Sequence, residues 1–416
     1  MMNQLGWVDF SPTHRNKVML VMDLFKEQGV IDELGLGTIR DSLSDILFPG
    51  TSTIQTRAKY FLLIPWIFQD IESRGRFDRF HSELEESEIF FVKILRKNSP
   101  EVNSGVIGRT LLNANPQRKP SSIYWNGLKK YKILNHAFSI TDYINYLKYH
   151  SKQLQAQKKQ IAESDGNVPS DDKDANHMYQ QHLWCQIPKP PTDWKTNLTI
   201  DLSEAEAKFL KERIILSDSD SLWSFALKHI PDEAKTFSDI TDFLSVETLP
   251  VKLKELVKLS VDFNRIMQGA LIRYNFLIQS SRENGRAKEL QPIWKNYWKE
   301  IQSFDWNSWD INKLWYYCPF TQYPTKKFIE SWIDLVRSTT FNETKADQLL
   351  KDRELRLKGI RRARLHDKAI AQKQQTFTGI SVFEDGSISY LNYRWNTVRT
   401  FLNDIQKGLA NNVTAQ

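Results

Sequence analysis

The sequence has few of the residues on which secreted and membrane-spanning proteins depend. Its 416 residues include two cysteines, Cys185 and Cys318, which lie far apart in the chain. Two cysteines exclude a disulfide framework, and a reducing, cytoplasmic compartment is expected. The longest uninterrupted apolar run covers residues 61–68 and contains a proline, whereas a bilayer span needs roughly 20 apolar residues. The first residues also lack the pattern of a signal peptide, so we expect no membrane partner.

Recognisable catalytic motifs are lacking too. The sequence has no phosphate-binding loop, dinucleotide-binding glycine pattern or nucleophile elbow. His177, His182 and Cys185 are the only metal-like cluster, but their spacing matches no zinc pattern, so we expect no metal or other cofactor. Residues 206–208 and 233–235 have the residue types of a restriction-type nuclease, yet both lie in helical sequence. A binding protein is therefore better supported than an enzyme.

Positive charge is concentrated in two short windows. Residues 109–132 hold six bases and no acid, and residues 351–373 hold nine bases and three acids, in a chain of net charge +7. Such clustering is typical of a polyanion-binding protein, although each window is also compatible with an ordinary solvated face. Arg57 and Lys59 follow a Thr/Ser helix cap near Thr51. They could grip a phosphate there or simply flank a core helix.

Apolar residues recur at helical spacing along most of the chain, which predicts a mainly α, multi-lobe protein. We expect a helical lobe at 1–150, a linker at 151–195, an aromatic-rich helical lobe at 196–340 and a C-terminal segment at 341–416. Residues 203–206 resemble a capping sequence, and residues 251–280 predict one long amphipathic helix. The C-terminal segment has a basic helix over 343–375, interrupted by Gly359, and a small β-hairpin around Asp385-Gly386.

The segment 105–135 combines basic and aromatic residues around one short helix. Pro120 and the two serines after it start this helix, its apolar side holds Ile123 and Leu128, and Trp125 and three lysines lie elsewhere around it. The pattern resembles the recognition helix of a helix-turn-helix or winged-helix unit, and also small helical subdomains that bind nothing.

Aromatic residues are dense at 294–323. Because a buried tryptophan removes a large area from water, we interpret most of them as core, with one or two exposed. The other interpretation is that aromatics interleaved with bases stack on unpaired nucleotides.

Four stretches together are similar to one protein family. They are residues 5–11, residues 32–41 with Asp32-Glu33-Leu34-Gly35, residues 48–61 with Gly50-Thr51-Ser52-Thr53-Ile54-Gln55-Thr56-Arg57-Ala58-Lys59-Tyr60, and residues 357–365 with 391–395. Over essentially its whole length the chain resembles a bacterial family catalogued as domain of unknown function 6361. The resemblance implies no activity and no catalytic residues. It implies a bacterial origin and a setting among mobile-element or anti-phage defence genes, often near helicases.

These observations favour a non-enzymatic nucleic-acid-binding component of a bacterial defence or DNA-processing system. DNA is the expected nucleic acid, and a helicase or other defence-system protein is the expected partner. Two alternatives remain, a scaffold whose basic windows dock an acidic partner and a nuclease or toxin with an unrecognised site. We expect the two windows to converge on one exposed surface. The residues expected to contact phosphate are Arg57, Lys59, Arg109, Arg118, Lys119, Lys129, Lys130, Lys132, Arg353, Arg356, Arg361, Arg362 and Arg364.

Overall fold

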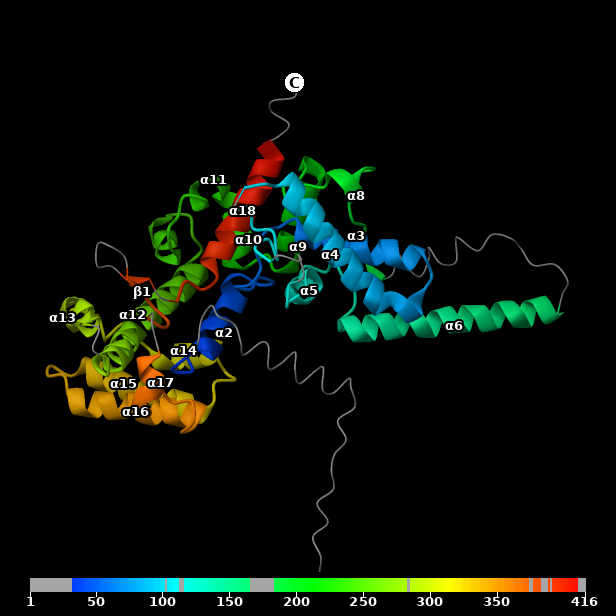
Figure 1. The fold of residues 1–416 in the computed structure, drawn as a ribbon. Coiled ribbons are helices and arrows are strands. Elements are labelled where there is room, and N and C mark those ends of the chain that lie inside the picture. Colours follow the sequence, from blue (N-terminus) through cyan, green and yellow to red (C-terminus); the bar gives the residue numbers. More distant parts are fainter. Residues whose placement is uncertain are drawn as a thin grey trace, which may run out of the picture. The chain divides into compact units, whose positions relative to one another are not determined.

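Figure 1 shows the computed structural model of the chain, which describes residues 32–101, 103–111, 116–164, 183–282, 285–373, 377–382, 388–389 and 391–410. Within these ranges the protein is mainly α-helical, which confirms the predicted class. No helix in these ranges is long and apolar enough to cross a membrane. Residues 5–11, His177 and His182 lie outside the described residues.

The chain forms two compact units, neither of which is continuous in sequence. Unit 1 comprises residues 1–41 and 259–391, and unit 2 comprises residues 42–258 and 392–416. These boundaries differ from the four segments expected from the sequence, because distant segments share a core. In unit 2, α9 (Glu204–Ser217) packs against α18 (Trp395–Ala410). The expected linker differs as well, since α6 (Ile140–Ser164) continues into it and Trp184 and Trp194 are buried.

Unit 2 is built around α3 (Tyr60–Ser73), in which every residue from Tyr60 to Phe68 is buried. A helix that is apolar on all sides belongs in a core, and α4 (Phe80–Asn98) and α5 (Pro120–Lys130) pack against it. The predicted capping sequence is confirmed, because the Ser203 hydroxyl accepts the Glu206 N–H and the Glu206 carboxylate accepts the Ser203 N–H. Unit 2 also contains η1 (Phe77–Arg79), α8 (Trp194–Asn197), α10 (Leu222–His229), α11 (Pro231–Ala234) and η2 (Ile240–Ser245).

The long helix expected at 251–280 is confirmed as α12 (Val251–Ser280), and the boundary between the units falls within it and within α2 (Gly37–Leu47). In unit 1, α15 (Tyr323–Arg337) packs against α13 (Ala287–Gln302) and α16 (Glu343–Lys358). Trp332 of α15 is fully buried and donates its indole N–H to the Ile266 carbonyl at 2.9 Å. Unit 1 also contains α14 (Ile311–Tyr317) and α17 (Lys368–Gln372).

Two short strands of unit 1, β1 (Ser381–Val382) and β2 (Ile388–Ser389), pair antiparallel. The Asp385-Gly386 turn expected between them lies outside the described residues. The β-hairpin therefore stays a prediction.

Glu72, a buried carboxyl of α3, gives unit 2 a pH-dependent stability. Tyr143 and Trp184 donate hydrogen bonds to it, and burial raises its pKa from 4.5 to about 7. The folded protein thus holds this proton more tightly than the unfolded chain does, so Glu72 lowers the free energy of unfolding as pH rises from about 4.5 to about 7.

We expect Glu72→Gln to remove this dependence. Relative to the parent, the free energy of unfolding of the variant should rise across that window by about 3 kcal/mol. Urea unfolding at several pH values measures the difference. Glu86→Gln, at an exposed position of α4, should show no such trend, and parallel profiles for the parent and Glu72→Gln would contradict the assignment.

Candidate nucleic-acid interface

Arg57 and Lys59 lie inside unit 2 and pair with its own carboxylates. The Arg57 guanidinium bonds to Asp404 at 2.9 Å and to Asp201 at 3.1 Å. The Lys59 ammonium lies 2.7 and 2.8 Å from the two carboxylate oxygens of Glu206, and both side chains are buried. Burial lowers the pKa of Lys59, and the Glu206 charge opposes that shift. Neither cation is presented to an external phosphate.

The Thr/Ser cap expected before α3 is wrong. The helix begins at Tyr60, and the residue at its cap position, Lys59, makes no side-chain cap hydrogen bond. Instead, the Asp404 carboxylate accepts the N–H of Ala58 at 2.9 Å. Because Asp404 belongs to α18, more than 300 residues away in sequence, local reasoning could not identify this partner.

The basic window at 109–132 lies in unit 2, and most of its cations have partners there. Arg109 donates to the Ser99 carbonyl at 2.6 Å. Lys119 lies 3.0 Å from the Glu85 carboxylate, and Lys130 lies 3.5 Å from that of Asp218. Arg118 and Lys129 are partly buried, whereas Lys132 is exposed.

Most of α5 faces the core. The buried set on this helix is Pro120, Ser121, Ile123, Tyr124, Trp125, Gly127 and Leu128. Its exposed residues, Ser122, Asn126 and Lys130, form one narrow stripe at four-residue spacing. A helix that reads a major groove needs a broader exposed face. The winged-helix interpretation of this segment gains no support from its burial.

The window at 351–373 lies in unit 1, so the two windows belong to different units. Two of its arginines, Arg353 and Arg364, are held within unit 1. Arg353 is buried and donates to the Leu34 carbonyl and the Thr325 hydroxyl, both at 2.8 Å. Arg364 donates to the Glu33 carboxylate at 2.6 Å. These two side chains fix the segment in place through contacts within unit 1.

Beneath this segment lies a buried ion network in which two carboxylates face two bases. Glu33 and Glu354 are fully buried, and Lys358 contacts both carboxylates. The Tyr274 hydroxyl lies 2.9 Å from Glu33 and 2.6 Å from Glu354. With Arg364 on Glu33, two basic side chains face the two buried carboxylates, which is the pairing that buried acidic groups require.

The same network shapes the turn that follows α16. Gly359 ends the helix with φ 71° and ψ 165°, a conformation that is essentially restricted to glycine. The chain then turns back, and the Glu354 carboxylate accepts the backbone N–H groups of Arg364 at 3.1 Å and Leu365 at 2.8 Å. We call residues 359–365 the basic turn. Its C-terminal end is therefore held by hydrogen bonds to the buried Glu354 carboxylate.

The basic turn presents the cations that stay available to an external ligand. Arg361 and Arg362 are exposed, as is Arg356 one helical turn before Gly359. Within the described ranges, the guanidinium groups of Arg356 and Arg361 have no hydrogen-bond or ion-pair partner. The exposed bases of the wider window are Lys351, Arg356, Arg361, Arg362, Lys368 and Lys373.

The acids of α16 do not cancel this charge. Glu343 and Asp347 both pair with Arg273, at 3.0 and 2.6 Å. Asp367 accepts the N–H of Ala369 at 2.8 Å and so caps α17. The C-terminal half of α16 and the basic turn keep a net positive charge at the surface, because the exposed acid there, Asp352, stands against the exposed bases Arg356, Arg361 and Arg362.

The backbone at Gly359 provides a test of how the turn is built. A Cβ at this position would meet nothing within 4 Å, so any cost of Gly359→Ala comes from the backbone conformation alone. We expect a loss of about 1–3 kcal/mol in the free energy of unfolding. Ile360→Ala, at the exposed next position, should cost less than about 0.5 kcal/mol. Equal effects in urea unfolding would contradict the role of Gly359.

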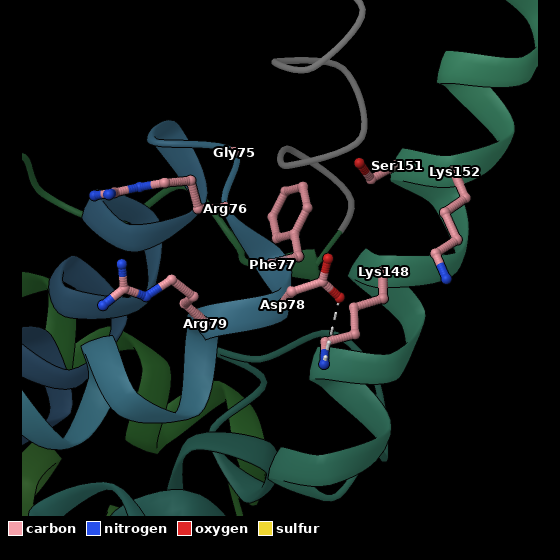
Figure 2. A pocket seen from close by; sticks show the side chains of 8 residues that line it. All are labelled: Gly75, Arg76, Phe77, Asp78, Arg79, Lys148, Ser151 and Lys152. Atoms are coloured by element: carbon pink, nitrogen blue, oxygen red, sulfur yellow. Dashed lines mark ion pairs between the residues drawn. The ribbon is translucent and has the colours of Figure 1, made fainter.

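A pocket in unit 2 contains cations that the sequence analysis did not select. It lies between η1 and α6 and has a volume of about 320 Å³ (Figure 2). Its basic lining residues are Arg76, Arg79, Lys148 and Lys152. Lys148 lies 3.9 Å from Asp78, and Arg76 lies 3.4 Å from Glu83, so acids of unit 2 compensate two of these charges. Figure 2 also shows Arg76 and Arg79 extending away from α6, so the cations do not converge on one point. The sequence indicated this group of cations only through the four-residue spacing of Lys148 and Lys152, which places both lysines on one side of a helix.

The nuclease alternative requires carboxylates and a lysine that converge in an open cleft. Glu33, Glu354 and Lys358 do converge, but protein donors occupy both oxygens of each carboxylate, and both carboxylates are fully buried. Among the described residues, no group of His, Cys, Asp and Glu has the arrangement of a metal site. The network therefore has a structural role, which is to hold the basic turn in place. The sequence did not indicate its members Glu33, Tyr274 and Glu354.

Fold and site together define a mainly helical protein of two units, one of which carries an exposed basic turn on a buried ion network. The chain belongs to the family described as a family of unknown function (DUF6361), whose model matches residues 2–408. Searches of curated proteins and of solved structures find no match. Stretches that carry the resemblance meet in each unit: Glu33 binds Arg364, and Arg394 donates to the Thr51 carbonyl at 2.8 Å.

Proposed function

We propose that this protein is a non-enzymatic nucleic-acid-binding protein that contacts backbone phosphates through the basic turn of unit 1. The observation that carries the proposal is the exposure of Arg361 and Arg362 on a turn whose backbone donates two hydrogen bonds to the buried Glu354 carboxylate. Arginine suits this task because its planar guanidinium matches the geometry of phosphate oxygens. A fixed backbone also reduces the entropy lost when the ligand binds.

The proposal uses a smaller set of residues than the sequence indicated. Arg356, Arg361 and Arg362 contact phosphate, with Lys351 and Lys368 extending the positive surface. Arg353 and Arg364 act as positioning residues, because each is held by an internal partner. Arg57 and Lys59 have no part in the interface, since they pair inside unit 2.

A binding assay across a salt series tests this function. The full-length protein and a labelled DNA of defined length would be titrated at salt concentrations between about 50 and 200 mM. Each phosphate contact releases counterions, so the logarithm of the binding constant should fall linearly with the logarithm of salt, with a slope of about −2 or steeper. No binding at the lowest salt, or binding independent of salt, would overturn the proposal.

We further propose that the protein acts in a bacterial defence or DNA-processing system in the cytoplasm, with a helicase or other defence-system protein as partner. The setting is what the resemblance of the sequence to this family implies, and the two free cysteines support a reducing compartment. Pull-down of the tagged protein from its own host, with nuclease treatment to remove bridging nucleic acid, tests the partner. Only unrelated abundant proteins in the eluate would contradict it.

A further inference from the structure

Three aromatic side chains of unit 1 lie on the surface within a stretch of eight residues. Tyr316 is 77 % exposed, Phe320 is 89 % exposed and Tyr323 is 73 % exposed. Large exposed apolar side chains that gather in one place usually mark a binding surface, whereas single ones need no explanation. The sequence predicted that the aromatic residues at 294–323 are mostly core, with one or two exposed. In the structure Tyr297 is buried, these three are exposed and the other aromatic residues of the stretch are partly buried.

Their exposure follows from the way their neighbours are held. Leu314 and Cys318 are buried on the inner side of α14, so Tyr316 faces outward. Phe320 lies in the short connection to α15, where the Thr321 N–H bonds to the Cys318 carbonyl at 3.2 Å. Tyr323 is the first residue of α15, which buries Phe328 on its inner side. The backbone is thus held on both sides by buried neighbours, and the three aromatic rings lie on the surface.

The charge around these rings is weakly positive. Residues 310–330 contain three lysines and two acids, Asp310 and Glu330, which lie at the two ends of the stretch. One of the lysines, Lys326, places its ammonium 5.1 Å from the centre of the Trp315 ring. Lys313 and Lys327 are exposed. Aromatic faces interleaved with cations are suited to a ligand that combines flat, stackable rings with negative charge.

This surface adjoins the basic turn within unit 1. Arg353 of α16 bonds to Thr325, two residues after Tyr323, and its guanidinium lies 5.2 Å from the centre of the Phe328 ring. Arg356 follows Arg353 by one helical turn. The contact between α15 and α16 therefore brings the first turn of α15, where Tyr323 lies, close to the half of α16 that holds Arg356.

We propose that Tyr316, Phe320 and Tyr323 stack on the unpaired bases of a single-stranded nucleic acid whose phosphates contact the basic turn and the lysines of residues 311–329. This inference rests on the proposed function and names its ligand class. A duplex keeps its bases stacked on one another and offers the rings no free faces, so the surface favours single strands. A purely apolar protein partner would leave the lysines without counter-charges.

The test compares two probes, an oligothymidylate single strand and a duplex of the same length, with the full-length protein. Single-strand binding should weaken by about 5- to 100-fold in each of the variants Tyr316→Ala, Phe320→Ala and Tyr323→Ala. Phe320→Trp keeps an aromatic ring at this position and should bind the single strand as the parent does. Duplex binding should change by less than about twofold, because those contacts are to phosphate. Tyr149→Ala, at a 61 % exposed tyrosine of unit 2, is the matched control and should have no effect.

The outcomes separate this inference from the function on which it rests. Loss of binding on charge reversal of Arg361 and Arg362, with no loss in the alanine variants, would overturn the stacking proposal and keep the function. Equal loss for single strand and duplex, or an equal loss from Tyr149→Ala, would also overturn it. Absence of binding to either probe at low salt would overturn both.

Discussion

Reversing the charges of the basic turn, with Arg361→Glu and Arg362→Glu together, should weaken nucleic-acid binding by about 100-fold at moderate salt. Both arginines are exposed, so the change removes two phosphate contacts and places two carboxylates beside the ligand. The plot of the logarithm of the binding constant against the logarithm of salt should become shallower by about 2, because each lost phosphate contact reduces the magnitude of its slope by about 1. Fluorescence anisotropy across a salt series measures the affinity and the slope.

The matched control is Lys252→Glu with Lys254→Glu. These lysines are exposed in the first turn of α12 in unit 2, so the double variant has the same net charge as the first one. Its affinity should stay within about threefold of the parent, since long-range charge effects are screened at moderate salt. If both double variants lose affinity equally, binding depends on net charge alone and the basic turn has no special role.

Removing the carboxylate of Glu354 should have the largest effect on stability. In the parent, Glu354 is fully buried, contacts Lys358 and accepts two backbone N–H groups of the basic turn. Glu354→Ala removes one of the two carboxylates that contact Lys358 and leaves the N–H groups of Arg364 and Leu365 without their acceptor, so we expect a loss of about 3–5 kcal/mol in the free energy of unfolding. Glu354→Gln keeps an acceptor and the shape, so its loss should be smaller.

Asp352→Ala provides the control for that experiment. Asp352 lies on the same helix and is exposed, with Gln348 donating to it at 2.8 Å. Its replacement should cost less than about 1 kcal/mol. Urea unfolding monitored by circular dichroism gives both values. A cost for Glu354→Ala no larger than that for Asp352→Ala would show that the network does not brace unit 1.

The sequence predicted the structure correctly wherever the structure depends on residues within one short segment. The capping box at Ser203 and the helix at 251–280 depend on residues a few positions apart, and both predictions are confirmed. The mainly α class follows from the same short-range periodicity. The sequence also located the charge of the C-terminal window, and its exposed members Arg356, Arg361 and Arg362 are those that the proposed function uses.

The sequence could not separate exposed cations from buried ones, because their partners lie far away in the chain. Arg57 pairs with Asp404, and Arg364 pairs with Glu33, across more than 300 residues in each case. A run of basic residues has the same sequence pattern whether its side chains are exposed or pair with distant acids. The exposure of Tyr316, next to the partly buried Tyr317, likewise depends on which side of a short helix meets the core.

Photo-cross-linking of the full-length protein to a single-stranded oligonucleotide, followed by mass spectrometry of the peptides, locates the interface directly. We predict cross-linked peptides from residues 311–329 and 351–368 of unit 1, with the nucleotide attached at or near Tyr316, Phe320 or Tyr323. Cross-links confined to unit 2, for example at the pocket between η1 and α6, would contradict the assignment of the interface to the basic turn.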